Sequence, residues 1–490
     1  MILVFLSVAR ALVSPPPRVR PLLLRPSSVA PVAESKGDRK WMQSAETVSL
    51  IAGASVGSGF LALPRAAAQL GPIPTYVALG ASWTYLLACT LALAEGTLRT
   101  RAAQREREGS YDEGASIFSV ASEALGGASL KKDLRTRIVL GLAAACFVAG
   151  ILATLSAQIA KARGLGMLLF PGFPTTFVVS ALSYYLAFGV SARFAERASA
   201  ALGVSMFLSF IVMLKGVASG FAGVAASGGI AAMAPAAAAA ASTPSNWAAL
   251  LPFAGAARNG DPWPMSVFCQ LLCFSEVVAV ASRSLLAEPV NASPRRLAAT
   301  LSIGGFVPLA MALALVAVGG SGFAGLLGGG KDPVDVLVSS GGALAAGSVV
   351  LFAATAIATT AIAGLLTASQ FVSDFLCDTY GYCSLRQRRV VRICSVALPA
   401  LVSYSSPDFF YTAMAFAGAI PVCFLWGVLP SFLLTPLRKR RRSSNDNKLA
   451  ILPGGAPFLT FLKLSSLLLF GVNLSTYLGP LLSTAIAALF

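Results

Sequence analysis

Apolar residues form repeated runs of about 20 along this chain, and charged residues gather in the short segments between the runs. An apolar helix of about 20 residues can cross roughly 30 Å of hydrocarbon. Inside a bilayer every backbone N–H and C=O must find a partner within the protein, so such runs predict helices. The chain lacks the short alternating segments typical of a β-barrel. We therefore predict an all-α membrane protein with about eleven transmembrane helices.

The predicted spans are long and apolar, and the segments between them are mostly short. They lie at Glu46–Leu70, Pro72–Leu98, Arg137–Ala160, Phe173–Val190, Ala200–Ala222, Pro264–Leu286, Leu297–Gly319, Ala346–Leu376, Arg389–Tyr404, Phe409–Leu434 and Phe458–Leu482. The stretch Val224–Ser245 is also apolar, but Gly228, Gly229 and Pro235 interrupt it. We interpret this stretch as a long loop outside the membrane.

Basic residues between the spans predict how the protein is oriented. With the N-terminus on the cytosol-equivalent side, the connections on that side hold most of the Lys and Arg. These inner connections are Arg99–Arg137, Arg193–Arg197, Arg283–Arg296, Arg386–Arg392 and Arg438–Lys448. The outer connections hold only Lys161, Arg163, Arg258 and Lys331, with Arg65 near the outer end of span one. This asymmetry follows the positive-inside rule and supports the interpretation of the alanine-rich stretch as a loop.

The first 40 residues are set apart as a targeting or disordered segment. Residues 1–33 contain four arginines and no Asp or Glu. Ile2–Val13 is apolar but too short to span a membrane, and the part that follows resembles a transit peptide. We expect a plastid (chloroplast) envelope location, reached through the secretory route. The alternative is a disordered cytosolic tail.

Composition excludes several classes of function. Only 12% of residues are charged, against about a quarter in soluble domains, and the mean hydropathy is +0.76. The net charge of +17 lies in the connections, where it sets orientation, so nucleic acid is not expected as a partner.

The residue types that carry catalysis or bind metals are scarce. The eight cysteines form no Cys-x-x-Cys motif, so we interpret them as small apolar packing residues. The chain has no histidine, which excludes a histidine triad, a histidine metal site and a histidine proton relay. Neither a catalytic constellation nor a repeated filter motif is visible, so a membrane-embedded enzyme and a channel are the weaker alternatives. No cofactor or metal is expected.

Span one concentrates small residues at mid-membrane depth. Within the seven residues from Gly53 to Gly59 lie three glycines (Gly53, Gly57 and Gly59), together with Ala54, Ser55 and Ser58. Glycine weakens a helix, and an unwound segment frees backbone N–H and C=O groups to bind the carboxylate and ammonium of a ligand, or an ion. A membrane tolerates such a segment only where it lines a cavity. The alternative is a Gly-xxx-Gly face for close helix packing.

The segment Gly53–Pro64 resembles the first helix of the aromatic amino acid permease (tyrosine/tryptophan permease) family, including the chloroplast-type tyrosine transporter homologues of plants and algae. Gly71–Pro74 opens span two as in the plant members, and Pro407–Gly418 is similar to the family's motif before its tenth helix. The likeness runs in order over about residues 45–485. The family belongs to the amino acid/polyamine/organocation superfamily.

The resemblance implies a LeuT-like fold of two inverted five-helix repeats with broken helices one and six. Here the transporter domain would be 41–490, with repeats at 46–222 and 264–434 and an extra helix at 458–482. The implied function is secondary active transport of an amino acid by alternating access, with tyrosine, tryptophan or phenylalanine as substrate and a proton as the symported ion. A sodium-coupled neutral amino acid transporter is the closest alternative.

Span six should form the other half of the substrate site, and its centre departs from the family pattern. The family usually has an aromatic-histidine pair here, whereas this chain has Phe274-Ser275 with no proline just after, which makes a break less evident. Glu276 follows, and an acid at this depth is costly unless it has a partner or a function. Phe274 and Ser275 are therefore candidates for substrate binding and Glu276 for proton coupling. Phe147, in span three, is a candidate wall for an aromatic side chain.

A second coupling hypothesis rests on spans five and eight. Lys215 lies deep in span five and is expected to face the interior, where some proton-coupled members of the superfamily place a lysine. Thr359 and Thr360 of span eight are similar to the family's Thr-Ser pair at the ion position. Together they suggest that an ammonium or a proton replaces sodium between spans one, five and eight. Paired hydroxyls in a helix more often bond back to the preceding turn.

Overall fold

The computed structural model describes most of the predicted membrane domain. The described residues are 44–45, 47–49, 51–53, 55–57, 59–108, 117–125, 134–170, 174–189, 192–226, 246–250, 263–275, 278, 294–327, 334, 338, 342–380, 385–404, 409–440, 449–452 and 455–489. The targeting segment predicted at residues 1–40 lies outside them, as do Ala54, Ser58 and Glu276. The division of the chain into the predicted domain and repeat boundaries stays a prediction.

The described part of the chain is helical and contains no strand. Its elements are α3 (Gly59–Leu70), α4 (Pro72–Glu108), α5 (Ile117–Leu125), α6 (Leu134–Leu169), α7 (Thr175–Tyr184), η2 (Tyr185–Gly189), α8 (Ala192–Ala226), η3 (Trp247–Leu250), α11 (Pro264–Leu271), α13 (Pro294–Leu327), α15 (Gly342–Tyr380), α16 (Leu385–Val402), α17 (Phe409–Ala417), η5 (Gly418–Val428), α18 (Leu429–Arg440) and α19 (Gly455–Leu489). A described helix overlaps each of the eleven predicted spans.

The helices differ in how completely each one could cross a bilayer. Seven of the described helices are long and apolar enough to span, and α17, η5 and α18 count as one of these. The remaining spans have identifiable reasons to fall short. Spans one and six are interrupted, and most of predicted span six after Ser275 lies outside the described residues. Helix α7 with η2 is short, and α16 begins with an arginine-rich turn.

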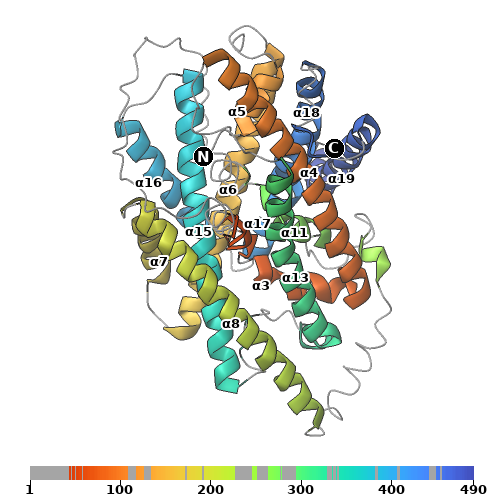
Figure 1. The fold of residues 1–490 in the computed structure, drawn as a ribbon. Coiled ribbons are helices and arrows are strands. Elements are labelled where there is room, and N and C mark those ends of the chain that lie inside the picture. Colours follow the sequence, from red (N-terminus) through yellow and green to blue (C-terminus); the bar gives the residue numbers. More distant parts are fainter. Residues whose placement is uncertain are drawn as a thin grey trace, which may run out of the picture.

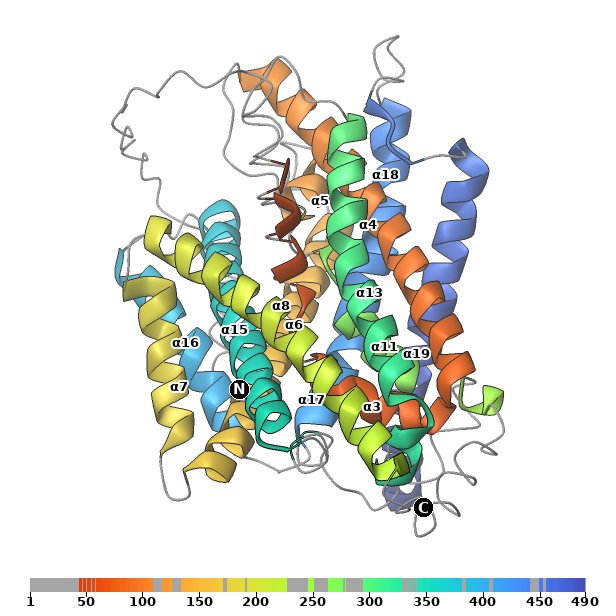
Figure 2. The ribbon, with the colours of Figure 1, turned by 60° about the horizontal axis from the view of Figure 1, so that its bottom comes forward.

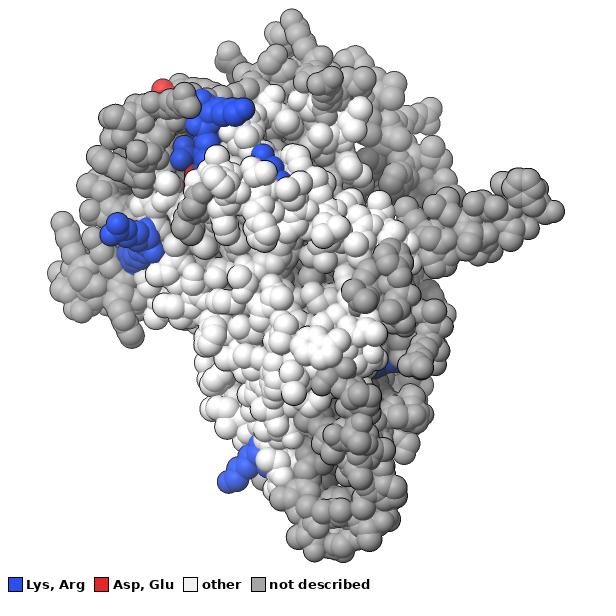
Figure 3. All heavy atoms as spheres, turned by 90° about the vertical axis from the view of Figure 1, so that its right-hand side faces the viewer, with Lys and Arg blue, Asp and Glu red and all other residues white. Residues whose placement is uncertain are grey.

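The helices form a bundle with the interrupted spans at its centre. Figures 1 and 2 show α7, α8, α15 and α16 on one side and α4, α13, α18 and α19 on the other, with α3, α11 and α17 between them. Figure 3 shows the exterior: basic residues gather in the upper part of this face, and a broad uncharged band lies below them. An uncharged band is the surface expected of a chain that faces lipid.

Both predicted breaks are present. In span one, the described residues between 44 and 53 are helical, Val56 and Gly57 are not, and α3 begins at Gly59. In span six, α11 ends at Leu271, and residues 272–274 leave the helix although no proline follows. The span-six break is therefore clearer in the structure than in the sequence.

Three phenylalanines join spans one, five and eight just beyond the first break. Phe60 of α3 lies 6.3 Å from Phe210 of α8 and 6.4 Å from Phe352 of α15, measured between ring centroids, and Phe210 lies 5.4 Å from Phe352. All three side chains are buried. The two contacts of Phe60 are edge-on, and each adds roughly 1 kcal/mol beyond the burial of area.

The loop interpretation of Val224–Ser245 is tested only at its edges. Helix α8 extends to Ala226, and residues 227–245 lie outside the described part. Beyond them, Asn246 donates its backbone N–H to the Leu70 carbonyl at 3.1 Å and its side-chain amide to the Gln69 carbonyl at 3.3 Å. Asn246 therefore satisfies carbonyls that the end of α3 leaves without helical partners.

A buried carboxylate fastens spans two, ten and eleven together at the inner end. The Glu95 side chain of α4 is fully buried, and Arg438 of α18 makes a two-pronged contact with it, with both N···O distances 2.7 Å. Arg99 donates to the same carboxylate at 3.0 Å. The backbone N–H groups of Ile451 and Leu452, just before α19, donate to it at 3.1 and 3.2 Å. We call Glu95, Arg99, Arg438, Ile451 and Leu452 the inner clasp.

Removing the charge of Glu95 should destabilise the whole bundle. Glu95→Gln leaves two arginines near a site that no longer balances their charge, and breaking a buried pair costs about 3–5 kcal/mol. We expect a clear fall in the temperature of thermal unfolding, followed by tryptophan fluorescence in detergent. Glu106→Gln, on the exposed end of the same helix, is the matched control and should change stability by less than about 1 kcal/mol, as expected for an exposed charge. Equal melting temperatures for the two variants would contradict the clasp.

Candidate transport site

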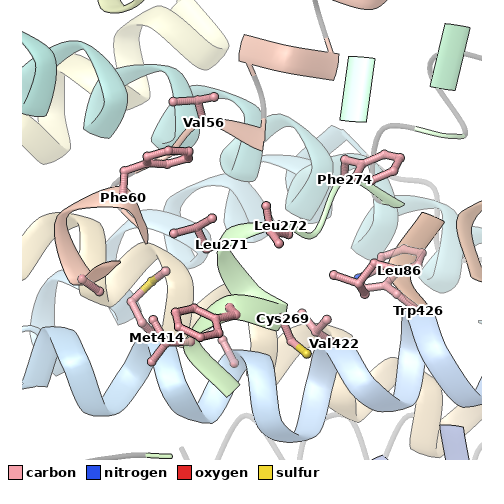
Figure 4. Close-up of a cluster of buried hydrophobic side chains, with 14 of the residues drawn as sticks. Val56, Phe60, Leu86, Cys269, Leu271, Leu272, Phe274, Met414, Val422 and Trp426 are labelled. Atoms are coloured by element: carbon pink, nitrogen blue, oxygen red, sulfur yellow. The ribbon is translucent and has the colours of Figure 1, made fainter. Parts of the chain in front are cut away.

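The breaks in spans one and six lie against each other. A Cβ built on Gly59, the first residue of α3, would lie 3.4 Å from Leu271 Cα, at the end of α11, and 3.1 Å from Met414 Cε of α17. Figure 4 shows Leu271 and Leu272 at the centre, with Val56 and Phe60 on one side and Leu86, Phe274 and Trp426 on the other. The start of one half-helix therefore meets the end of another.

This meeting of helix ends has an electrostatic consequence. The N-terminus of α3 exposes N–H groups and carries a partial positive charge, and the C-terminus of α11 exposes C=O groups and carries a partial negative charge. An amino acid has a carboxylate and an ammonium group, so the two ends offer it complementary partners. Three described backbone bonds lie at this break: Val56 N–H donates to the Ala52 carbonyl at 2.9 Å, Gly57 N–H to the Ser55 carbonyl at 3.0 Å, and Phe60 N–H to the Gly57 carbonyl at 3.2 Å.

Gly57 provides the close approach between span one and span eight. A Cβ at Gly57 would lie 2.5 Å from Thr360 Oγ1 and 3.3 Å from Thr360 Cγ2. The hydroxyl of Thr360 therefore points at the break, while it donates to the Ala356 carbonyl at 2.8 Å. Thr359 is buried and also bonds back to its own helix, to Thr355 at 3.0 Å. Both threonine hydroxyls thus donate to carbonyls of the preceding turn of α15, and Thr360 lies at the break.

The small residues of span one differ in their surroundings. Gly53 has open space where a Cβ would stand, so nothing in the described structure requires glycine there. Ser55 is buried and donates to the Ile51 carbonyl at 2.6 Å, which satisfies its hydroxyl within the helix. Gly57 and Gly59 are the positions where the packing leaves little room for a side chain.

Phe274 and Ser275 pack against spans two and seven. The Ser275 hydroxyl lies 2.6 Å from the Thr90 hydroxyl of α4, and both are buried. The Phe274 ring lies against Gly305 of α13, where a Cβ would overlap it. Trp83 of α4 donates its indole N–H to the Gly305 carbonyl at 2.9 Å. These contacts hold the span-six break in place.

Phe147 lies beside the site, and its ring is stacked on another. Its centroid is 3.6 Å from that of Phe371 in α15, with an interplanar angle of 23°. Phe147 also lines a small cavity between α6, α11 and η5, together with Thr154, Gln270 and Trp426. The cavity volume is about 10 Å³, close to the minimum for one water molecule. An amino acid would need these side chains to move.

The prediction that Lys215 faces the interior is wrong. The buried positions of α8 include Phe210, Met213 and Val217, and the Lys215 side chain is exposed. Lys215 is two residues from both Met213 and Val217, which is roughly 200° around a helix of 3.6 residues per turn. It therefore points away from the stripe that packs on α15. The apolar character of α8 predicts that Lys215 lies deep in the membrane, but the direction of its side chain depends on the phase of the helix.

Gln270 is a site residue that the sequence reasoning missed. It lies on α11 just before the break, and its amide nitrogen lies 3.3 Å from the Thr154 hydroxyl of α6. Its Oε1 is buried and has no hydrogen-bond partner in the part of the chain that the structure describes. The feature of the sequence that could have indicated it is a single amide side chain within the apolar run Val267–Leu271. A lone buried acceptor beside a cavity is costly unless something binds it.

Among the described residues no group of His, Cys, Asp and Glu could hold a metal ion. The helical bundle with two facing breaks has the architecture of the LeuT fold. Solved structures agree with this fold. A mutant of the manganese transporter of Eremococcus coleocola is similar over 92% of this chain and 90% of its own, with 15% identity and a TM-score of 0.58.

Mhp1, a nucleobase-cation-symport-1 family transporter in a closed conformation with bromovinylhydantoin bound, is similar over 88% of this chain and 90% of its own. The identity is 15% and the TM-score 0.50. The model of the tryptophan/tyrosine permease family matches residues 41–228 and 278–473, and the chain belongs to that family. No curated protein matches the chain by sequence. The protein is thus a multi-pass integral membrane transporter rather than an enzyme.

The contact between Gly57 and Thr360 can be tested by a mutant cycle. Gly57→Ala places a methyl group against the threonine side chain, and overpacking of this kind costs about 1–3 kcal/mol. Thr360→Ala removes the two atoms that the methyl would meet most closely, Oγ1 and Cγ2, and leaves only Cβ at 3.4 Å, so the double variant should regain most of the loss in thermal stability. Gly53→Ala, where space is open, should be neutral. Additive effects of Gly57→Ala and Thr360→Ala would contradict the contact.

Proposed function

We propose that the protein carries an aromatic amino acid across the membrane by proton-coupled symport with alternating access. The observation that carries this proposal is the meeting of the α3 N-terminus with the α11 C-terminus, Gly59 against Leu271, at the centre of the bundle. Backbone ends of opposite polarity are suited to the carboxylate and ammonium groups of an amino acid. Membership of the tryptophan/tyrosine permease family favours an aromatic side chain.

The proposed binding site is made of the two breaks and the side chains around them. It contains the predicted positions Gly53, Ala54, Ser55, Gly57, Ser58 and Gly59 of span one, Phe147 of span three, and Phe274 and Ser275 of span six. To these we add Gln270, whose unpartnered Oε1 could accept a hydrogen bond from the substrate ammonium. The family match leaves out residues 229–277, so the part of the site on span six is argued from this chain alone.

For the coupling site we propose Glu276 as the proton carrier and Thr359 and Thr360 as its neighbours at the break. Glu276 directly follows Ser275, in a chain without histidine, so it is the acidic group that the sequence places closest to the site. Thr360 supports the location because its hydroxyl points at the break. The same oxygen could instead serve sodium, which prefers oxygen ligands, so sodium coupling is the alternative. Lys215 is left out of the proposal because it is exposed.

We also propose the plastid envelope as the membrane. The support is the acid-free N-terminal sequence alone. A fluorescent fusion of the full chain should colocalise with an envelope marker, and labelling of another membrane would overturn this location.

Reconstituted protein should take up labelled tyrosine, tryptophan or phenylalanine in preference to leucine when a pH gradient is imposed. Gln270→Leu should weaken the apparent affinity for the substrate about tenfold, because it removes an acceptor for a charged group. The thermal stability of Gln270→Leu should match that of the wild type, because the substitution also removes the cost of burying an unpaired acceptor. Absence of uptake of any amino acid by folded protein, under either a pH or a sodium gradient, would overturn the substrate assignment.

The coupling residue can be separated from the substrate site by the driving force. Glu276→Gln should abolish the response of uptake to the pH gradient while substrate exchange across the membrane continues. Lys215→Met is the matched control and should leave the response unchanged, since the lysine faces away from the core. If Glu276→Gln keeps its pH response and Thr360→Val loses a response to sodium, the ion is sodium and the proton proposal is wrong.

A further inference from the structure

A groove separates the first half of span one from α13 on the side of the bundle. It has a volume of about 520 Å³, and Ser44, Val48, Ala52, Arg296 and Val307 are among its lining residues. Figure 2 shows the dark red segment that precedes α3 running beside α13. The two walls touch at the deep end, where a Cβ on Gly304 would lie 2.8 Å from Ile51 Cβ. This groove is distinct from the site at the helix breaks.

We propose that this groove binds an anionic phospholipid of the inner leaflet, with the phosphate headgroup at Arg296 and one acyl chain along α13. The proposal does not depend on the nature of the transported substrate. It rests on the shape of the groove, the distribution of its polar groups and the position of its open side.

The length of the groove fits one leaflet. Along α13 it extends from Arg296 to Val307, eleven residues that rise roughly 16 Å. Half of the hydrocarbon core of a bilayer is roughly 15 Å thick. The polar end is at the start of α13, which the distribution of basic residues assigns to the inner side. An acyl chain that enters beside Arg296 would therefore end near the midplane.

The charge at the polar end is positive and only partly satisfied. Arg296 donates from Nε to the Ser44 hydroxyl at 2.7 Å, and its Nη2 is buried with no hydrogen-bond partner among the described residues. Helix α13 begins at Pro294, so its N-terminal N–H groups lie next to the arginine. The described residues that line the groove include Arg296 and no acid, and Arg295 precedes this arginine in the chain. A phosphate diester is the group that this end is suited to bind.

The open side of the groove faces the part of α13 that is exposed. Ile303 lines the groove and is 58% exposed, and Phe306, one turn along, is 50% exposed. In a membrane protein such residues face lipid, so an occupant would enter from the bilayer rather than from water. The apolar walls offer nothing to a free anion below the headgroup, and an acyl chain fills them without leaving polar groups unpaired. An anionic phospholipid satisfies both ends.

Native mass spectrometry of the purified full chain with added phosphatidylglycerol or phosphatidylcholine tests the proposal. Wild-type protein should retain one phosphatidylglycerol more strongly than phosphatidylcholine. Arg296→Gln should weaken that retention about tenfold, as expected for the loss of a hydrogen-bonded ion pair. Ala299→Trp, at an exposed lining position, keeps the arginine and fills the groove, and it should also lose the lipid.

The control is Arg389→Gln, which removes the same charge from an exposed position on α16 at the same predicted side of the membrane. It should keep the bound phosphatidylglycerol. Three results would overturn the proposal: equal retention of the two lipids by the wild type, equal loss in Arg296→Gln and Arg389→Gln, or undiminished retention in Ala299→Trp. Thermal unfolding of every variant without lipid confirms that each compared protein is folded.

Discussion

Unpaired backbone groups are expensive in a bilayer, and this constraint governs how the two broken helices can exist at all. Each break removes helical partners from several N–H and C=O groups in the middle of an apolar bundle. Here the breaks lie against each other and neighbouring helices enclose them. Thr90 of α4 bonds to Ser275, and Trp83 of α4 bonds to Gly305 of α13. Thr360 of α15 approaches Gly57 from the other side. The same groups that need partners are those that we propose to bind the substrate. The stability of the bundle and the proposed transport site therefore rest on one arrangement.

Polar contacts away from the breaks decide which helices pack together. The inner clasp joins α4, α18 and the segment before α19 through a single carboxylate. Deeper in the bundle, Ser266 of α11 donates to Asn473 of α19 at 2.8 Å, so the extra helix is attached to the broken span six. Van der Waals packing between apolar helices is poorly specific because lipid tails are equally apolar, and a few buried hydrogen bonds supply the register. The backbone of the same serine also meets span ten. Gly418 approaches the Ser266 carbonyl so closely that a Cβ there would overlap it, and this brings span ten against span six.

Much of the fold could be predicted because the bilayer imposes length and polarity on each helix. A described helix overlaps each of the eleven predicted spans, and the resemblance of span one to the permease family implied its break. The span-six break was harder to see because no proline follows Phe274, and the helix ends there through its tertiary contacts. The site was predicted less completely. Thr360 does lie at the break, but Lys215 faces outward, and Gln270 stood in the sequence as an ordinary amide in an apolar run.

The sequence by itself determined that the protein spans a membrane with helices and that span one is rich in glycine, because these properties depend on composition and local spacing. The positions of its basic residues predict how the chain is oriented. Its likeness to the permease family came from ordered motifs. Only the tertiary structure decided which side chains meet. The phase of α8 turned Lys215 away from the core, and the packing of α11 on α6 left the Gln270 oxygen without a described partner. The approach of span one to α13 left a groove beside Arg296. Rotation about a helix axis and the choice of neighbour are set by contacts between residues far apart in the chain, and hydropathy along the chain contains little information about either.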